Sequence, residues 1–402
     1  GVFAENKGPG NISVVTSAGD VIDTSATGSA AIHAVNDASA TPSSSSVTVI
    51  ANGSIFSGPN TTGAGNPSAG ILAGYNTNDQ PQNNVAGNVS IDDFANINFN
   101  GAVTAPTGTD GIRAFNFGTG NITVIAEANA TVAGDRYGIF ANQHNGGNIT
   151  IVSNGTIIGN GTATGNAGIN ASTTGAGSIY IDINGSVSSP VQDITATTGS
   201  GPVSIVITSS GTLMDGAVAI NATGGTIIVD NAGTMDGSVA LVGSSGVTLV
   251  NHSTAIWDMS GASTFGAGAN FIKNNGIIDV SGLSSVTAAG TLTVYGNGSI
   301  MLSDGASFEI NAAVTAGETV VFTATTTSET LKIDQSLTLP FNAAISGLTA
   351  NVNDTIDLVD LTFGANTSVF YTALTGTSGT LTVSDGNGHT EMFSLVNYTG
   401  SG

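Results

Sequence analysis

Short apolar segments separated by polar turns recur along the whole chain. The plainest stretch runs from Gly138 to Gly161 and holds three such segments, at 138–141, 148–152 and 156–159. Within each segment apolar and polar residues alternate, which predicts a β-strand with one buried face. No segment is long enough for a helix, and none can bury its apolar face alone. The pattern therefore predicts one coil of a solenoid, which is stabilised by stacking on copies of itself.

The spacing of the middle segment supports this interpretation. Its first apolar residue recurs at Ile12, Val47, Val89, Ile122, Ile149, Ile179, Val203, Ile227 and Val247. The intervals of 20 to 42 residues contain strands and turns only, which is typical of a β-solenoid. No 3.6-residue apolar stripe persists, and glycine interrupts every candidate helix. We therefore expect an all-β fold, a parallel β-helix that is right-handed because crossover connections favour that hand.

The repeat pattern predicts two regions. Residues 1–311 carry the β-helix repeats, whereas residues 312–402 have different units and form either a small C-terminal β module or modified terminal coils. Within the second region, the sequence SDGNG at 384–388 predicts a hairpin turn between two apolar segments.

The early coils are lengthened by inserted loops. The extra residues fall at 37–45, 58–68, 75–86 and 105–110, and we expect no core residues among them. In solenoids such insertions often form a binding face, and they can equally be tolerated surface padding. The sequence leaves both interpretations open.

Four asparagines occupy the same place just before the middle strand. They are Asn11, Asn88, Asn121 and Asn148, and each begins an Asn-x-Ser/Thr triplet. The triplets could be glycosylation acceptors. The favoured prediction is an internal asparagine ladder at a turn, because asparagine tolerates turn conformations and bonds neighbouring backbone.

Composition narrows the classes of partner. The chain has 402 residues, 27 acidic and 5 basic, and a formal charge of −22, so its field should repel nucleic acid and anionic membranes. It has no cysteine, which rules out disulfides and thiolate metal sites. It also has no apolar run of about 18 residues, so we expect no insertion of this segment into a membrane.

The chemistry-bearing residues do not predict a catalytic site. Asp92 and Asp93 are adjacent and should point to opposite faces of a strand, so they cannot act as a pair. The four histidines are scattered without metal-ligand spacing; they are His33, His144, His252 and His389. The alternative is a glycan-active β-helix enzyme, a polysaccharide lyase or hydrolase. It would require two or three acidic residues from different coils to converge, and three carboxylates within about 6 Å in a groove would favour this alternative.

The densest acidic run is Asp354, Asp357 and Asp360. Clustered carboxylates can bind calcium, which makes this run a candidate metal site. The three-residue spacing suits a strand poorly, because Asp354 and Asp357 would face opposite ways. The alternative is a set of solvated charges that discourages pairing of sheet edges.

One column of residues is a candidate binding surface. When the Gly-Ile-x-Ala strands are aligned, the residue after each inward isoleucine or valine faces outward. This predicts a strip composed of Phe3, His33, Leu72, Arg113 and Phe140. Such a strip could dock a glycan or a cell-surface receptor. Alternatively, the loops at 37–45 and 75–86 fold over the strip and bury it, which is the favoured expectation.

Two stretches resemble known families. The segments NITIVSNGTIIG (148–159) and STAIWDMSGASTFGAGANFIKNNGIIDVSG (253–282) resemble passenger regions of bacterial autotransporters. The tail at 353–400, with Thr-Ile-Asp-Leu and Gly-Thr-Leu-Thr-Val-x-Asp-Gly, looks like a module of large secreted surface proteins of alphaproteobacteria.

The resemblance implies an extracellular, repeat-built surface or adhesin-like protein. Because the residues do not predict a catalytic site, the leading hypothesis is a non-enzymatic structural or adhesive segment on the bacterial cell surface. A further alternative is a self-assembling filament or layer subunit, with copies stacked end to end or laterally. Open solenoid ends invite such stacking unless they are capped.

Overall fold

The computed structural model describes residues 1–24, 26–60, 68–75, 80–103, 105–323, 326–334, 338–348 and 352–398. This part of the chain is 58% strand and 0% helix, so it has no helix long and apolar enough to cross a membrane. It divides into two compact units, Gly1–Ile227 and Ile228–Gly402. In both units parallel strands stack coil on coil, which confirms the predicted β-solenoid.

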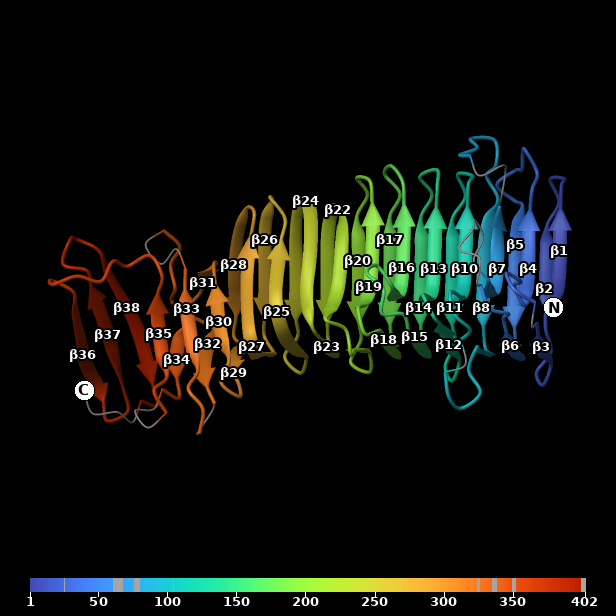
Figure 1. Ribbon diagram of the computed structural model, residues 1–402. Helices are drawn as coiled ribbons and strands as arrows, with labels where there is room; N and C mark the ends of the chain where they lie inside the picture. Colours follow the sequence, from blue (N-terminus) through green and yellow to red (C-terminus); the bar gives the residue numbers. More distant parts are fainter. Residues whose placement is uncertain are drawn as a thin grey trace. The chain divides into compact units, whose positions relative to one another are not determined.

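The first unit is a stack of three-stranded coils, drawn from blue to green in Figure 1. The first strands of the coils are β1 (Val2–Asn6), β4 (Ile32–Asn36), β7 (Ala69–Tyr75), β10 (Asp110–Asn116), β13 (Tyr137–Gln143), β16 (Ala167–Thr173) and β19 (Gln192–Thr198). The second strands are β2 (Ile12–Val15), β5 (Ser46–Ala51), β8 (Asn88–Asp93), β11 (Ile122–Ala126), β14 (Ile149–Ser153), β17 (Ile179–Ile183) and β20 (Val203–Ile207). The third strands are β3 (Val21–Asp23), β6 (Ser54–Phe56), β9 (Asn96–Ile97), β12 (Thr131–Gly134), β15 (Thr156–Gly159), β18 (Ser186–Ser188) and β21 (Thr212–Met214). The boundary between the units falls within β22 (Val218–Asn231).

The register of the second strands confirms the predicted spacing. Ile12 pairs with Val47, Val89 with Ile122, and Ile149 with Ile179. These residues are buried, whereas the residues between them point outward, so the alternation of the sequence is the alternation of the coil. Each inward methyl-bearing side chain lies directly on its counterpart about 4.8 Å away, and this continuous apolar ladder forms the core.

The predicted asparagine ladder is present. The side-chain oxygen of each asparagine accepts a hydrogen bond from a backbone N–H of the next coil. Asn121 N donates to Asn88 Oδ1 at 2.8 Å, and Asn148 N donates to Asn121 Oδ1 at 2.9 Å. Asn11 and Asn148 bond Ser46 and Ser178 in the same way. The ladder lies at the surface and is not internal, because three of its four members are exposed. The asparagine side chains therefore take the place of water as acceptors for the backbone N–H groups of the turn, and their amide groups are not buried.

The expectation that the long loops contain no core residues was wrong. Ala38 is 2% exposed and Val85 is 0% exposed. Thr41 forms a parallel bridge with Val85, and its backbone oxygen accepts a hydrogen bond from Ala86 N. Loops of neighbouring coils thus stack on one another as the strands do, which buries apolar side chains outside the main core.

The second unit begins with longer strands and ends in an antiparallel sheet. Its strands are β23 (Thr234–Asp236), β24 (Ser238–Asn251), β25 (Ile256–Phe265), β26 (Ala269–Asn274), β27 (Ile277–Ala288), β28 (Thr291–Gly296), β29 (Ser299–Leu302), β30 (Ser307–Ile310), β31 (Ala313–Val314), β32 (Thr319–Phe322), β33 (Thr330–Ile333), β34 (Ala344–Ser346), β35 (Thr355–Leu358), β36 (Ser368–Thr375), β37 (Ser378–Ser384) and β38 (Thr390–Val396). Parallel pairing continues through β33 with β35 and β34 with β38, whereas β36 pairs antiparallel with β37, and β37 with β38. The predicted hairpin turn is confirmed, since Ser384 pairs with Thr390 across it.

A second asparagine ladder lies inside this unit. Asn231 donates to the side-chain oxygen of Asn251, which donates to Asn274, each at 2.9 Å. The next rung is Gly296, and Glu318 reaches over it to accept from Asn274 at 3.0 Å. Because all four polar side chains are buried, the ladder exchanges hydrogen bonds within the core, and the glutamate ends it.

Candidate functional site

The predicted outward strip forms a single column in the structure. Phe3 pairs with His33, His33 with Leu72, Leu72 with Arg113, and Arg113 with Phe140. Strands β1, β4, β7, β10 and β13 place these side chains on the outer face of successive coils. The alignment of Gly-Ile-x-Ala segments in the sequence is therefore confirmed as a spatial register.

Exposure varies along this column. Phe3 is 69% exposed and stacks on the His33 ring with centroids 4.6 Å apart. Leu72 is only 4% exposed and packs in a cluster with Val35 and Phe115. Leu72 is thus buried, as the favoured expectation has it, but the residues packed against it belong to β4 and β10 and not to the loops at 37–45 and 75–86, whereas Phe3 is exposed. Residues 61–67 and 76–79 of the predicted loops lie outside the described residues.

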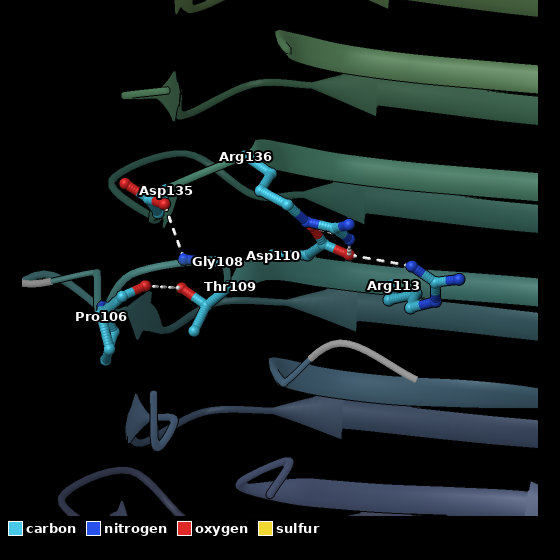
Figure 2. Close-up of polar contacts among 7 residues, drawn as sticks. All are labelled: Pro106, Gly108, Thr109, Asp110, Arg113, Asp135 and Arg136. Carbon is cyan, nitrogen blue, oxygen red and sulfur yellow. Dashed lines mark hydrogen bonds and ion pairs between the residues drawn. The ribbon is translucent and has the colours of Figure 1, made fainter. Parts of the chain in front are cut away.

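The most organised part of the column surrounds the carboxyl group of Asp110. Asp110 begins β10 and is fully buried. Arg136 donates two hydrogen bonds to Oδ1 and one to Oδ2, at 2.8 to 3.1 Å, and Arg113 donates one to Oδ2 at 3.2 Å. Figure 2 shows the carboxyl group between the two guanidinium groups. Both arginines of the chain therefore bind one carboxylate, and the trio keeps a net positive charge of one.

Each arginine also lies over an aromatic ring of β13. The guanidinium carbon of Arg113 is 4.6 Å from the centroid of Phe140, and that of Arg136 is 5.4 Å from Tyr137. The two rings are themselves 5.2 Å apart. We refer to Asp110, Arg113, Arg136, Tyr137 and Phe140 as the arginine–aromatic cluster.

The turns that precede β10 and β13 hold this cluster in place. The backbone N–H of Gly108 donates to Asp135 at 2.6 Å, and Arg136 N donates to Thr109 O at 2.9 Å. The hydroxyl of Thr109 bonds Pro106 O at 2.6 Å, as Figure 2 shows. Two neighbouring turns are thus locked together, so the arginines leave the backbone at fixed positions.

Burial dominates the electrostatics of the cluster. It raises the pKa of Asp110, and the charges of Arg136 and Arg113 oppose that effect. Burial also lowers the pKa of Arg113, whereas Asp110 raises it. Each charged form is costly alone and is stabilised by its partner, so the cluster behaves as one unit.

The exposed groups of the cluster are planar guanidinium groups and aromatic rings. The side chains of Arg113 and Arg136 are 18% and 33% exposed, and Tyr137 and Phe140 are partly exposed. Aromatic faces and guanidinium planes stack on flat apolar surfaces, and guanidinium edges donate hydrogen bonds in a fixed fork. This arrangement can recognise a ligand that has an apolar face and a rim of oxygen atoms.

The sequence pattern identified Arg113 and Phe140 but missed Asp110, Arg136 and Tyr137. A signal was available, because Asp110 and Tyr137 occupy the same position, two residues before the isoleucine, in adjacent coils. Arg136 lies one residue before Tyr137. Extending the alignment of the Gly-Ile-x-Ala segments by two residues toward the N-terminus would have placed Asp110, Arg136 and Tyr137 beside the strip.

The structure does not gather the predicted calcium ligands. Asp354 accepts a hydrogen bond from Glu329 N at 3.1 Å, Asp357 pairs in register with Lys332, and Asp360 lies in the turn after β35. Among the residues described, no group of three or more histidine, cysteine or acidic side chains is placed to hold a metal ion.

Two acidic arrangements bear on the enzyme alternative. Asp92 points outward beside Glu127, and Asp93 points inward and is buried, so the prediction that adjacent aspartates face opposite ways is confirmed. Burial raises the pKa of Asp92, and Glu127 raises it further. This pair contains two carboxyl groups, fewer than the three within about 6 Å that would favour the enzyme alternative.

The other arrangement is a column of three aspartates in the second unit. Asp236, Asp258 and Asp279 occupy one register position on β23, β25 and β27. Burial raises the pKa of Asp258, and the charges of Asp279 and Asp236 raise it further. The outer two are about 10 Å apart at the backbone because two coil steps separate them. This spacing of the backbone does not bring three carboxylates within about 6 Å of one another, the arrangement that would favour the enzyme alternative.

Together the fold and this surface define a parallel β-solenoid with an ordered arginine–aromatic cluster on its outer strands. No family model matches the chain, and comparison with curated proteins and with solved structures found no match to either. The functional argument therefore depends on the geometry of the described residues.

Proposed function

We propose that this chain is a non-enzymatic structural and adhesive segment of a bacterial surface protein, in which a β-solenoid presents the arginine–aromatic cluster to a glycan. The observation that carries the proposal is the placement of both arginines and two aromatic rings around one buried carboxylate. The autotransporter-like repeats support an extracellular location on the cell surface.

The scaffold suits a binding surface that must keep its shape. The strands that carry the cluster pair with the coils on both sides, β10 with β7 and β13, and β13 with β10 and β16. Side chains fixed in this way lose little conformational freedom when a ligand binds, which favours affinity on a small surface.

A glycan matches the cluster better than nucleic acid does. A sugar ring offers a C–H face to Tyr137 or Phe140 and hydroxyl oxygens to the guanidinium edges. The formal charge of −22 repels the phosphates of a nucleic acid, and the cluster offers them a net charge of only +1.

The test is a glycan array with the purified chain, followed by binding to cells that display the strongest ligand. We expect Phe140→Ala and Arg113→Ala to reduce binding by roughly tenfold each, which is the effect of losing one stacking contact or one charged donor. Phe271→Ala removes a ring that is 40% exposed in the second unit and should leave binding unchanged. Binding that survives both cluster substitutions would refute the proposal.

A further inference from the structure

A polar pocket lies at the turns between the second and third strands of the first coils. It has a volume of about 200 Å³ and is lined by Gly19, Asp20, Val21, Asn52, Gly53, Ser54, Phe94, Ala95, Asn96 and Asn129. These residues come from four successive coils, and none belongs to the arginine–aromatic cluster. The pocket is therefore separate from the site proposed above.

Turn length explains why the surface is hollow here. Register places the turns 17–20, 52–53, 94–95 and 127–130 above one another. The two central turns have two residues each, and the outer two have four each. Two short turns between two long ones leave a recess, with the short turns as its floor and the long turns as its walls.

Gly53, in the floor of the pocket, lets its turn lie close to the turn that contains Asp20. A Cβ atom at Gly53 would lie 2.3 Å from the backbone oxygen of Asp20, so a side chain there would push the two turns apart. Phe94, in the next turn, is 49% exposed although it is a large apolar residue. An aromatic ring is thus held at the surface of an otherwise polar recess.

The polar side chains around this ring are half used. Asn52 donates through Nδ2 to Thr16 O at 2.8 Å, and Asn96 accepts through Oδ1 from Thr131 N at 3.2 Å. Asp20 accepts through Oδ2 from Ser17 N at 2.7 Å. Within the described residues, Asn52 Oδ1, Asn96 Nδ2 and Asp20 Oδ1 have no hydrogen-bond partner. Each side chain is fixed by one polar atom, and its other polar atom stays available.

The same arrangement of turn lengths recurs with different residues. The short turns 154–155 and 184–185 lie between the long turns 127–130 and 208–211. Here Asn184 donates to Asn154 Oδ1 at 3.0 Å, and Asn154 donates to Glu127 at 3.2 Å. Both polar atoms of Asn154 are therefore used, Asn184 is bonded through its Nδ2, and no aromatic residue occurs at either floor turn. Phe94 therefore distinguishes the pocket and does not follow from the turn lengths alone.

We infer that this pocket binds one neutral sugar ring, with its C–H face on Phe94 and its hydroxyls bonded to Asp20, Asn52 and Asn96. The available atoms include both donors and acceptors, which hydroxyl groups can match. The carboxylate of Asp20 disfavours an acidic sugar. The inference rests on the proposed glycan adhesion and adds a second contact, on another corner of the coil.

Saturation-transfer NMR on the whole chain tests the inference, with the methyl glycosides of glucose, galactose, mannose, N-acetylglucosamine and glucuronic acid as probes. We expect transfer to the ring protons of at least one neutral glycoside that Phe94→Ala reduces, and no transfer to the glucuronide that Phe94→Ala reduces. Phe94→Ala should weaken that binding roughly tenfold, and Phe94→Tyr should retain it.

Control variants separate this pocket from the cluster and from misfolding. Tyr180→Ala removes a partly exposed ring elsewhere in the first unit and should leave transfer unchanged, with circular dichroism confirming the fold of each variant. Transfer that Phe140→Ala abolishes and Phe94→Ala does not would overturn the inference and leave the proposed function standing. If no probe shows saturation transfer, the inference is wrong. The glycan array decides the proposed function separately.

Discussion

Asp110 is the residue on which the arginine–aromatic cluster depends, because its carboxylate is the shared acceptor of both arginines. Glu318 is its counterpart in the second unit, where it ends the buried asparagine ladder. The two carboxyl groups differ in their partners. Asp110 faces two cations, whereas Glu318 faces a neutral amide, so the cost of ionising them differs.

Asp110→Ala should destabilise the first unit by about 3 kcal/mol, because it leaves two partly buried guanidinium groups without their counter-charge. Urea unfolding at pH 7 measures the change. Asp135→Ala, which removes an acceptor of a single backbone hydrogen bond, should cost about 1 kcal/mol. Equal losses in the two variants would contradict the central role of Asp110.

Glu318 should make stability fall as pH rises. Burial raises its pKa from 4.5 to about 6, so the folded state holds the proton more tightly than the unfolded state. Its contribution is complete below pH 4.5 and is lost as pH rises through 6, by about 2 kcal/mol. The unfolding free energy of Glu318→Gln should therefore fall about 2 kcal/mol less between pH 4 and pH 7 than that of the unchanged chain. Parallel curves for the two proteins would refute the assignment.

At the scale of elements, the chain uses asparagine ladders in two ways. The ladder that contains Asn148 lies on the surface and bonds backbone N–H groups, where water could substitute. The ladder that contains Asn251 is buried, and its members bond each other. Loss of a rung therefore has different consequences, because an unsatisfied buried amide has no solvent to bond.

Asn251→Ala should cost about 3 kcal/mol, since it removes the side-chain hydrogen bonds of Asn251 to Asn231, Asn274 and Ile277 O and leaves the buried Oδ1 of Asn274 without its donor. Asn148→Ala is the matched control and should cost about 1 kcal/mol or less. Chemical unfolding of both variants gives the comparison. A larger loss for Asn148→Ala would show that burial does not decide the effect.

At the scale of the whole molecule, each coil contacts the coils before and after it. Ile151 of β14, for example, pairs with Val124 of β11 and Ile181 of β17. Stability in such a stack is a sum of coil and neighbour terms, so damage should spread only locally. This property also suits a display segment, because loops on one coil can change without disturbing distant ones.

Ile151→Ala should therefore have a graded effect within the first unit. The substitution creates a cavity costing about 3 kcal/mol and should reduce hydrogen-exchange protection in β11, β14 and β17. Protection in β2 and β5, which lie three or more coils away, should change little. A uniform loss of protection across the unit would instead indicate a single cooperative transition.

The sequence by itself determined the coil. Alternation in segments such as Ile149–Ser153 fixed which residues face the core, and the recurrence of those segments fixed the parallel register of Phe3, His33, Leu72, Arg113 and Phe140. Both follow from local geometry, because a strand has a period of two and identical coils stack in register.

Only the tertiary structure decided what those positions contact. It placed Asp110 between Arg113 and Arg136, and it exposed Phe94 in a recess formed by turns of unequal length. It also buried Val85 in a loop where the sequence predicts surface. These features depend on side chains from neighbouring coils, and a linear pattern does not record which atoms face one another once the coils stack.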